Sequence, residues 1–218
     1  MTGSRFRSVI FDCDSTLTAI EGIEELARGH RIEIARLTEL AMRGAVQLEE
    51  VYGRRLELIR PSLAEVAEVG ARYIAAVVPG AVETVERLHR AGVTVQVLSG
   101  GLGPAVRVLT RHLGIEDAMV AAVELRFGPT GEYLGFDSGS PLTRSAGKRR
   151  WIETSGATLQ RPRLLVGDGA TDLEARPALD AFAAFTGVVS REEVVRGADV
   201  VIAGPSLTDL LPYCGLSA

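Results

Sequence analysis

Short apolar runs without a helical period recur along the chain, and each is followed by a small or polar residue. Runs of this length that are rich in β-branched residues are typical of strands buried on both faces of a parallel sheet. Between them lie segments whose apolar positions repeat at helical spacing. This alternation predicts an α/β fold with a doubly wound, Rossmann-like parallel sheet. The expected strands are residues 8–11, 93–98, 163–166, 181–185 and 199–202, and the expected helices are residues 81–90, 104–113 and 145–154.

One connection is far too long for an ordinary crossover between strands. Residues 17–78 show no strand pattern, although a crossover between parallel strands needs only a dozen or more residues. Apolar residues repeat there at helical spacing, and Gly29, Gly44 and Pro61 interrupt the pattern. We therefore expect an all-helical cap domain at residues 17–78, inserted into a core domain made of residues 1–16 and 79–218.

A second insert is expected at residues 123–136. Two short apolar segments flank the turn sequence Gly128-Pro-Thr-Gly131, which is typical of a β-hairpin. With 218 residues, the chain is longer than one sheet requires. The cap and this hairpin account for the excess.

Composition and charge exclude several classes of protein. The 46% share of hydrophobic residues and the 24% share of charged residues exclude a disordered, collagen-like or disulfide-scaffold chain. The formal net charge is −4, so we expect neither a nucleic-acid partner nor an anionic membrane surface. No stretch approaches the roughly 18 consecutive apolar residues of a membrane span, and the start of the chain shows no signal-peptide pattern. We therefore expect a cytoplasmic protein, as a monomer or a homodimer.

Two pairs of acidic residues follow predicted strands. Asp12 and Asp14 come directly after the first strand, and strand alternation places both side chains on the same side. Ligands of such sheets bind beyond the carboxyl ends of the strands, where this pair could bind Mg²⁺ or act as nucleophile and acid/base. Asp168 and Asp172 follow another strand. Four acids without partners would repel one another, so we expect a divalent cation among them.

A candidate phosphate site lies at the end of a third strand. Ser99 supplies a hydroxyl there, and Gly100 and Gly101 leave N–H groups free just before a predicted helix. Lys148 lies early in another predicted helix, where the helix dipole does not favour a cation, so it either serves a ligand or is a solvated surface charge. Together with the acids, these groups are what phosphoryl transfer needs.

This set of motifs resembles the haloacid dehalogenase superfamily of phosphatases. Its signature matches at Asp12-x-Asp14-x-Thr16, Ser99, Lys148 and Gly167-Asp168-Gly169-x-x-Asp172. Residues 11–17 and 21–27 are similar to the start of the phosphoserine phosphatase family within that superfamily, and residues 42–44 and 55–59 are similar to its cap.

The resemblance implies hydrolysis of a small phosphate ester, phosphoserine first, through an aspartyl-phosphate. Asp12 would attack phosphorus, and Asp14 would protonate the leaving group and then activate water. Asp12, the backbone carbonyl of Asp14, and Asp168 would hold Mg²⁺, with Asp172 placing its water shell. The remaining implied substrate contacts are Glu21 for the ammonium, Arg55 for the carboxylate, Met42 on the cap side, and Ser99, Gly100, Lys148 and Thr171 around the phosphoryl group.

Two departures from the family pattern concern the substrate. Leu48 stands where many members have Phe, and Thr171 where many have Asn, so another small phosphate ester is the first alternative. A receiver-type signalling module, which accepts a phosphoryl group and binds a partner, is the non-enzyme alternative. The two inserts and Asp14 argue against it. We expect Tyr73 and Trp151 to be packing residues.

Overall fold

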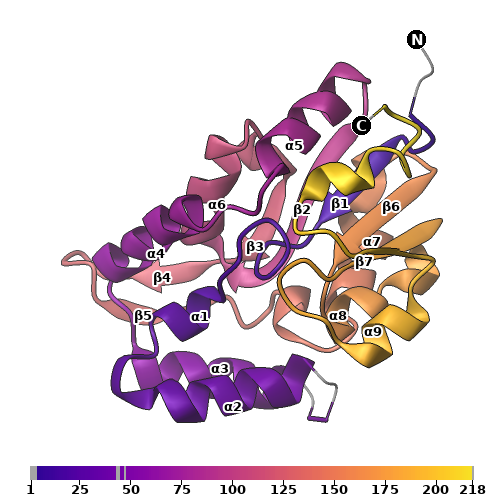
Figure 1. The fold of residues 1–218 in the computed structure, drawn as a ribbon. Helices are drawn as coiled ribbons and strands as arrows, with labels where there is room; N and C mark the ends of the chain where they lie inside the picture. The colour runs from indigo at the N-terminus through magenta and orange to yellow at the C-terminus, as the bar shows by residue number, and fades with distance from the viewer. Residues whose placement is uncertain (1–3, 43–44, 47, 218) are drawn as a thin grey trace.

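Six parallel strands form the centre of the protein, seen here in a computed structural model that describes residues 4–42, 45–46 and 48–217 (Figure 1). The strand order is β3-β2-β1-β6-β7-β8, so the first strand lies in the middle of the sheet. The strands are β1 (Ser8–Phe11), β2 (Thr94–Leu102), β3 (Val120–Val123), β6 (Arg163–Gly167), β7 (Ala181–Phe185) and β8 (Val200–Ile202).

Burial along the strands explains their sequence pattern. Every residue of β1 and β7 is buried, as expected where helices cover both faces of a parallel sheet. In Figure 1 helices flank the sheet on its two sides. These core helices are α5 (Ala81–Arg90), α6 (Gly103–His112), α7 (Gly147–Ser155), α8 (Ala170–Leu173) and α9 (Glu192–Gly197).

The structure confirms the α/β class and the five expected strands. The three expected core helices are also confirmed, with bounds that differ by no more than two residues. The sequence pattern missed β3, an edge strand in which only Val123 is fully buried. It also ended β2 too early, because Ser99, Gly100 and Gly101 continue the strand as far as Leu102.

The long connection between β1 and β2 is helical, as the sequence predicts. It contains α1 (Gly22–Glu25), α2 (Arg31–Met42), α3 (Leu48–Ile59) and α4 (Leu63–Ala75). In Figure 1 α2 and α3 form a pair apart from the sheet, whereas α4 runs beside α6. Gly70 permits that packing, since a Cβ there would lie 2.7 Å from the Cβ of Val108 on α6. The division into domains at residues 17 and 78 remains a prediction.

The expected hairpin is a separate two-stranded antiparallel sheet of β4 (Leu125–Phe127) and β5 (Tyr133–Phe136). It contacts the helical connection, because the N–H of Leu63 on α4 donates a 2.8 Å hydrogen bond to the carbonyl of Gly131.

In the part of the chain that the structure describes, no helix is long and apolar enough to cross a lipid bilayer.

Candidate active site

A cavity at the carboxyl ends of β1, β2 and β6 collects most of the residues expected from the sequence. Asp172 is fully buried beside it, in contact with Lys148. Met42 ends α2, and its side chain, like that of Leu48, lies outside the described residues. The expected residues that line the cavity are Asp12, Asp14, Glu21, Arg55, Ser99, Gly100, Lys148, Asp168 and Thr171.

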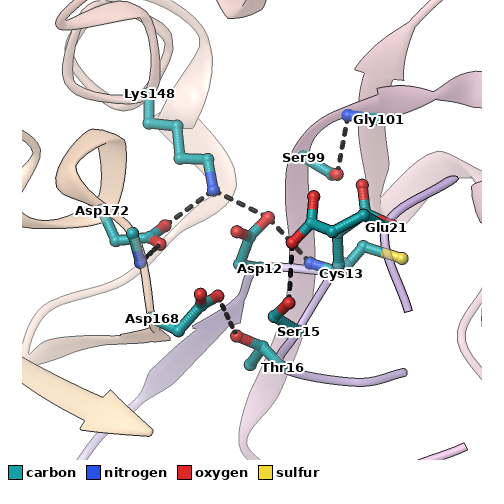
Figure 2. Close-up of polar contacts among 12 residues, drawn as sticks. Asp12, Cys13, Ser15, Thr16, Glu21, Ser99, Gly101, Lys148, Asp168 and Asp172 are labelled. Carbon is teal, nitrogen blue, oxygen red and sulfur yellow. Dashed lines mark hydrogen bonds and ion pairs between the residues drawn. The ribbon is translucent and has the colours of Figure 1, made fainter. Parts of the chain in front are cut away.

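Lys148 links two acids that are far apart in the sequence (Figure 2). Its Nζ lies 2.7 Å from Asp12 Oδ1 and 2.6 Å from Asp172 Oδ1. The side chain is only 4% exposed, so the surface alternative for Lys148 is wrong. The absence of a side chain at Gly147 allows Lys148 to lie there, because a Cβ at Gly147 would lie 1.9 Å from the carbonyl oxygen of Pro141. The start of α7 can therefore pass against that loop and direct the lysine inward.

Three carboxylates converge in a group that suits a cation. One oxygen each of Asp12, Asp168 and Asp172 lies within 4.8 Å of the others. Thr16 donates a 3.2 Å hydrogen bond to Asp168, whose carboxylate is also contacted by the Arg191 guanidinium. An all-oxygen donor set fits a hard divalent cation such as Mg²⁺. The Asp14 carboxylate is not part of this group, and a contribution from its backbone carbonyl remains a prediction.

Crowding of acids changes their protonation. Burial, and then the charge of Asp172, raise the pKa of Asp12 to about 7, although Lys148 opposes the shift. Burial also raises the pKa of Asp168 well above its usual value, with Asp12 and Asp172 adding to the effect and Arg191 opposing it. Like charges this close cannot all ionise without counterions. Three carboxylates face the two cations Lys148 and Arg191, so the group favours further bound positive charge.

Asp14 lines the same cavity and is held by two hydrogen bonds. Its Oδ1 accepts hydrogen bonds from the Gly22 N–H, at 3.2 Å, and from the Tyr73 hydroxyl. Burial, followed by the charge of Glu21, raises its pKa well above the usual value. The raised pKa favours the protonated form of Asp14, which could donate its proton to a leaving group.

The contact of Tyr73 with Asp14 corrects the expectation that this tyrosine only packs. Tyr73 is fully buried on α4, and a Cβ at Gly22 would lie 2.0 Å from its hydroxyl oxygen. Position 22 must therefore be glycine, because any side chain there would occupy the place where the Tyr73 hydroxyl reaches Asp14. Sequence alone offers no signal for this contact, since 59 positions separate the two residues.

The loop at the end of β2 is shaped by its glycines. Ser99 Oγ accepts a 2.9 Å hydrogen bond from the Gly101 N–H, as Figure 2 shows. A Cβ at Gly101 would lie 3.0 Å from Asp14 Oδ2 and from Ser99 Oγ, so only glycine passes without displacing them. Thr171, at the start of α8, lines the same cavity. Hydroxyls and backbone groups thus line the cavity together with the Asp12 carboxylate.

The helical connection contributes an acid and a cation. Glu21 Oε1 accepts a 2.6 Å hydrogen bond from Ser15 Oγ. Arg55 is 3% exposed, and its Nη1 donates a 3.1 Å hydrogen bond to Thr38 Oγ1. Its Nε has no hydrogen-bond partner among the described residues, and burial lowers its pKa. A buried guanidinium with a free donor favours an anionic ligand.

Comparison with known proteins agrees with this geometry. The family model of haloacid dehalogenase-like hydrolases matches residues 9–176. The chain is 38% identical to the phosphoserine phosphatase of Bos taurus, over 88% of this chain and 87% of that protein. It is also 38% identical to the chloroplastic phosphoserine phosphatase of Arabidopsis thaliana, over 89% of this chain and 68% of that one.

A solved structure extends the similarity to three dimensions. A phospho-aspartyl intermediate analogue of a phosphoserine phosphatase has a TM-score of 0.82 and 28% identity, covering 95% of this chain and 98% of that one. The chain therefore belongs to the haloacid dehalogenase-like hydrolases and, within them, to the phosphoserine phosphatase family.

Proposed function

We propose that the protein hydrolyses phosphoserine to serine and phosphate, with Mg²⁺, through an aspartyl-phosphate at Asp12. The observation that carries this proposal is that two sets of groups line one cavity. Asp12, Ser99 and Lys148 come from the core domain, and Glu21 and Arg55 come from the helical connection between β1 and β2. The first set suits a phosphoryl group, and the second suits the ammonium and carboxylate of an amino acid.

In the first half of the reaction, an Asp12 carboxylate oxygen attacks phosphorus and the bond to the serine oxygen breaks. Lys148, the Ser99 hydroxyl and the Gly100 N–H hold the phosphoryl oxygens, with Thr171 nearby. Asp14 gives its proton to the departing serine oxygen. Its hydrogen bonds hold the carboxyl group in place for this step.

In the second half, Asp14 takes a proton from a water molecule that attacks the phosphorus, and the bond to Asp12 breaks. The carboxylates of Asp12 and Asp168 would hold Mg²⁺, which when bound neutralises phosphoryl charge. Asp172 would place the water around the ion while it also pairs with Lys148. The group of three carboxylates supports this assignment.

Substrate recognition depends on the helical connection. The Glu21 carboxylate would bind the substrate ammonium, and the Arg55 guanidinium would bind its carboxylate through two parallel hydrogen bonds. Met42 would line the cap side of the substrate site. The names of the curated relatives support phosphoserine as the substrate. A cytoplasmic monomer or homodimer, without nucleic-acid or membrane partners, completes the proposal.

A panel of phosphate esters with Mg²⁺ tests the proposal. We expect phosphoserine to be hydrolysed in preference to phosphothreonine, phosphoethanolamine and sugar phosphates. Asp12→Asn should lower kcat at least about 10⁴-fold, because the nucleophile is lost. Thermal unfolding of this isosteric variant controls for folding.

Other outcomes would contradict the proposal in different ways. If another ester is hydrolysed fastest, the proposed substrate is wrong but the proposed phosphatase chemistry stands. Absence of any preference would refute phosphoserine. A phosphorylated Asp12 that persists for minutes would favour the receiver-type alternative.

A further inference from the structure

Tyr52 lies on α3, where it connects three parts of the molecule. Its side chain is 2% exposed, and its hydroxyl donates a 2.8 Å hydrogen bond to the carbonyl of Gly100, next to Ser99. Its ring centre lies 5.3 Å from that of Phe136 on β5 and 5.5 Å from the guanidinium carbon of Arg55. Tyr52 also lines the cavity, although no motif in the sequence includes it.

Arg55 depends on this ring for its position. A long side chain loses much rotational freedom when it is held in one place, and Arg55 has a single hydrogen bond, to the neutral Thr38 hydroxyl, among the described residues. The face of an aromatic ring attracts a guanidinium and restricts where it can lie. Tyr52 therefore supplies the second contact that orients Arg55.

The other end of Tyr52 reaches the phosphate-binding loop. Gly100 offers its N–H to the phosphoryl group in the proposed function, and its carbonyl accepts the hydrogen bond from Tyr52. One rigid side chain thus contacts both the loop and Arg55. Its ring also packs against Phe136 of the hairpin, which restricts its movement.

We propose that Tyr52 is a positioning residue that fixes the separation between Arg55 and the loop at Gly100, and so favours esters that carry a carboxylate as well as a phosphate. This inference rests on the proposed function, in which Arg55 binds the substrate carboxylate. An ester that carries a carboxylate, such as phosphoserine, contacts both Arg55 and the loop. An ester without one, such as phosphoethanolamine, keeps its phosphate contacts and its ammonium contact with Glu21 but makes none with Arg55, so it does not depend on their separation.

Tyr52→Phe removes the hydroxyl and keeps the ring. Tyr133→Phe is a matched control, because Tyr133 is 3% exposed and its ring centre lies 5.6 Å from the guanidinium carbon of Arg60. Its hydroxyl has no hydrogen-bond partner among the described residues, so its removal breaks no such contact. Steady-state kinetics with phosphoserine and phosphoethanolamine then compare the two variants with the parent protein.

We expect Tyr52→Phe to lower kcat/KM for phosphoserine by about 3- to 10-fold, the effect of one lost hydrogen bond. The loss should fall mainly on KM, because Tyr52 does not contact the reacting phosphorus. The value for phosphoethanolamine should stay within about twofold of the parent. In an Arg55→Met background, Tyr52→Phe should not lower kcat/KM further for either ester, since the separation between residue 55 and the Gly100 loop then has no function.

Amide hydrogen exchange gives a second readout that needs no ester. The amides of α3 should exchange faster in Tyr52→Phe than in the parent and in Tyr133→Phe. An equal loss for both esters would assign Tyr52 a merely structural role. Unchanged exchange, or an effect that persists in the Arg55→Met background, would also overturn the inference.

The two proposals fail in different ways. If the parent protein shows no preference for phosphoserine over phosphoethanolamine, both the substrate and the role of Tyr52 are refuted. If the parent shows the preference and Tyr52→Phe retains it in full, only the role of Tyr52 is refuted.

Discussion

Lys148 and Arg55 are buried cations that line the same cavity, yet the protein satisfies them differently. Lys148 pairs with the carboxylates of Asp12 and Asp172. Burial alone would lower the pKa of Lys148, but these two carboxylates outweigh it and the net shift is upward. Among the described residues, Arg55 has one hydrogen bond, to the hydroxyl of Thr38, and lies against the face of an aromatic ring. Burial lowers its pKa, although the charges of nearby acids oppose the shift.

The difference between Lys148 and Arg55 matches their proposed roles, Lys148 in the phosphoryl-transfer step and Arg55 in substrate recognition. A buried charge is stable when it is paired and costly when it is not. Lys148 is paired with two carboxylates of the protein before any substrate arrives. The charges of nearby acids act on Arg55, but no carboxylate of the described residues forms a salt bridge with it, and its Nε is left for a ligand. A substrate that brings a carboxylate there gains an interaction that other esters cannot make.

The largest expected effect comes from breaking the paired cation. Lys148→Met leaves two buried carboxylates without their partner, so the free energy of unfolding should fall by about 3–5 kcal/mol. Loss of a charged donor to the phosphoryl group should also lower kcat by about 10²- to 10³-fold. Urea denaturation and phosphate release measure the two effects.

Arg149→Met is the matched control for this loss of a cation. Arg149 lies beside Lys148 on α7, but its ion pair with Glu153 is exposed, so the free energy of unfolding should change by less than about 1 kcal/mol. A Lys148→Met protein as stable as this control would contradict the comparison.

A smaller effect on stability is expected at the unpaired cation. Arg55→Met removes a buried charge without stranding a partner, so the free energy of unfolding should change by less than about 1 kcal/mol. Loss of charge-assisted hydrogen bonds should lower kcat/KM for phosphoserine by about 10- to 100-fold, with phosphoethanolamine little affected. Equal losses of kcat/KM for both esters, or a fall in the free energy of unfolding as large as that of Lys148→Met, would contradict the difference between the two cations.

The smallest effect concerns Glu24 on α1, one of the acids whose charge acts on Arg55. Burial, with Glu21 adding to it, raises the pKa of Glu24 from 4.5, against the opposing effects of Thr38 and Arg55. Above pH 4.5 and up to the raised pKa, the folded state binds more protons than the unfolded state, so the free energy of unfolding falls as pH rises.

Glu24→Gln removes this pH-dependent cost. The variant should be more stable than the parent near pH 7, and the difference should shrink as the pH approaches about 4. Denaturation across this range measures it, with the exposed Glu193→Gln as the control for the loss of one negative charge. A difference that grows toward low pH would reverse the sign and refute the assignment.

Local sequence patterns predict the polar residues after the core strands better than the cavity residues of the helical connection. Asp12, Ser99 and Asp168 could be found because short buried strands and the residues after them are local patterns. The position of a strand end then follows from the fold class. The residues alone leave Lys148 between two alternatives, because burial of its helix start depends on Gly147 passing close to a loop, and the family resemblance is what places it in the site.

Tyr52 and Tyr73 could not be found in the same way. Each lies at an ordinary position on a helix, and its polar contact comes from a segment at least 48 positions away in the sequence. Such contacts depend on how helices pack after the sheet has formed. The edge strand β3 was missed for a related reason: it is only half covered, so its sequence lacks the continuous buried pattern of β1.

The central place of β1 has a consequence for the way the protein is made. The N–H of Asp12 donates to the carbonyl of Val166 on β6, and the neighbouring Thr16 bonds to Asp168, 152 positions later. Until those residues have been synthesised, β1 is an apolar segment with an unpaired edge, which is a hazard for aggregation. Asp12 thus reaches its final position only after β6 has left the ribosome.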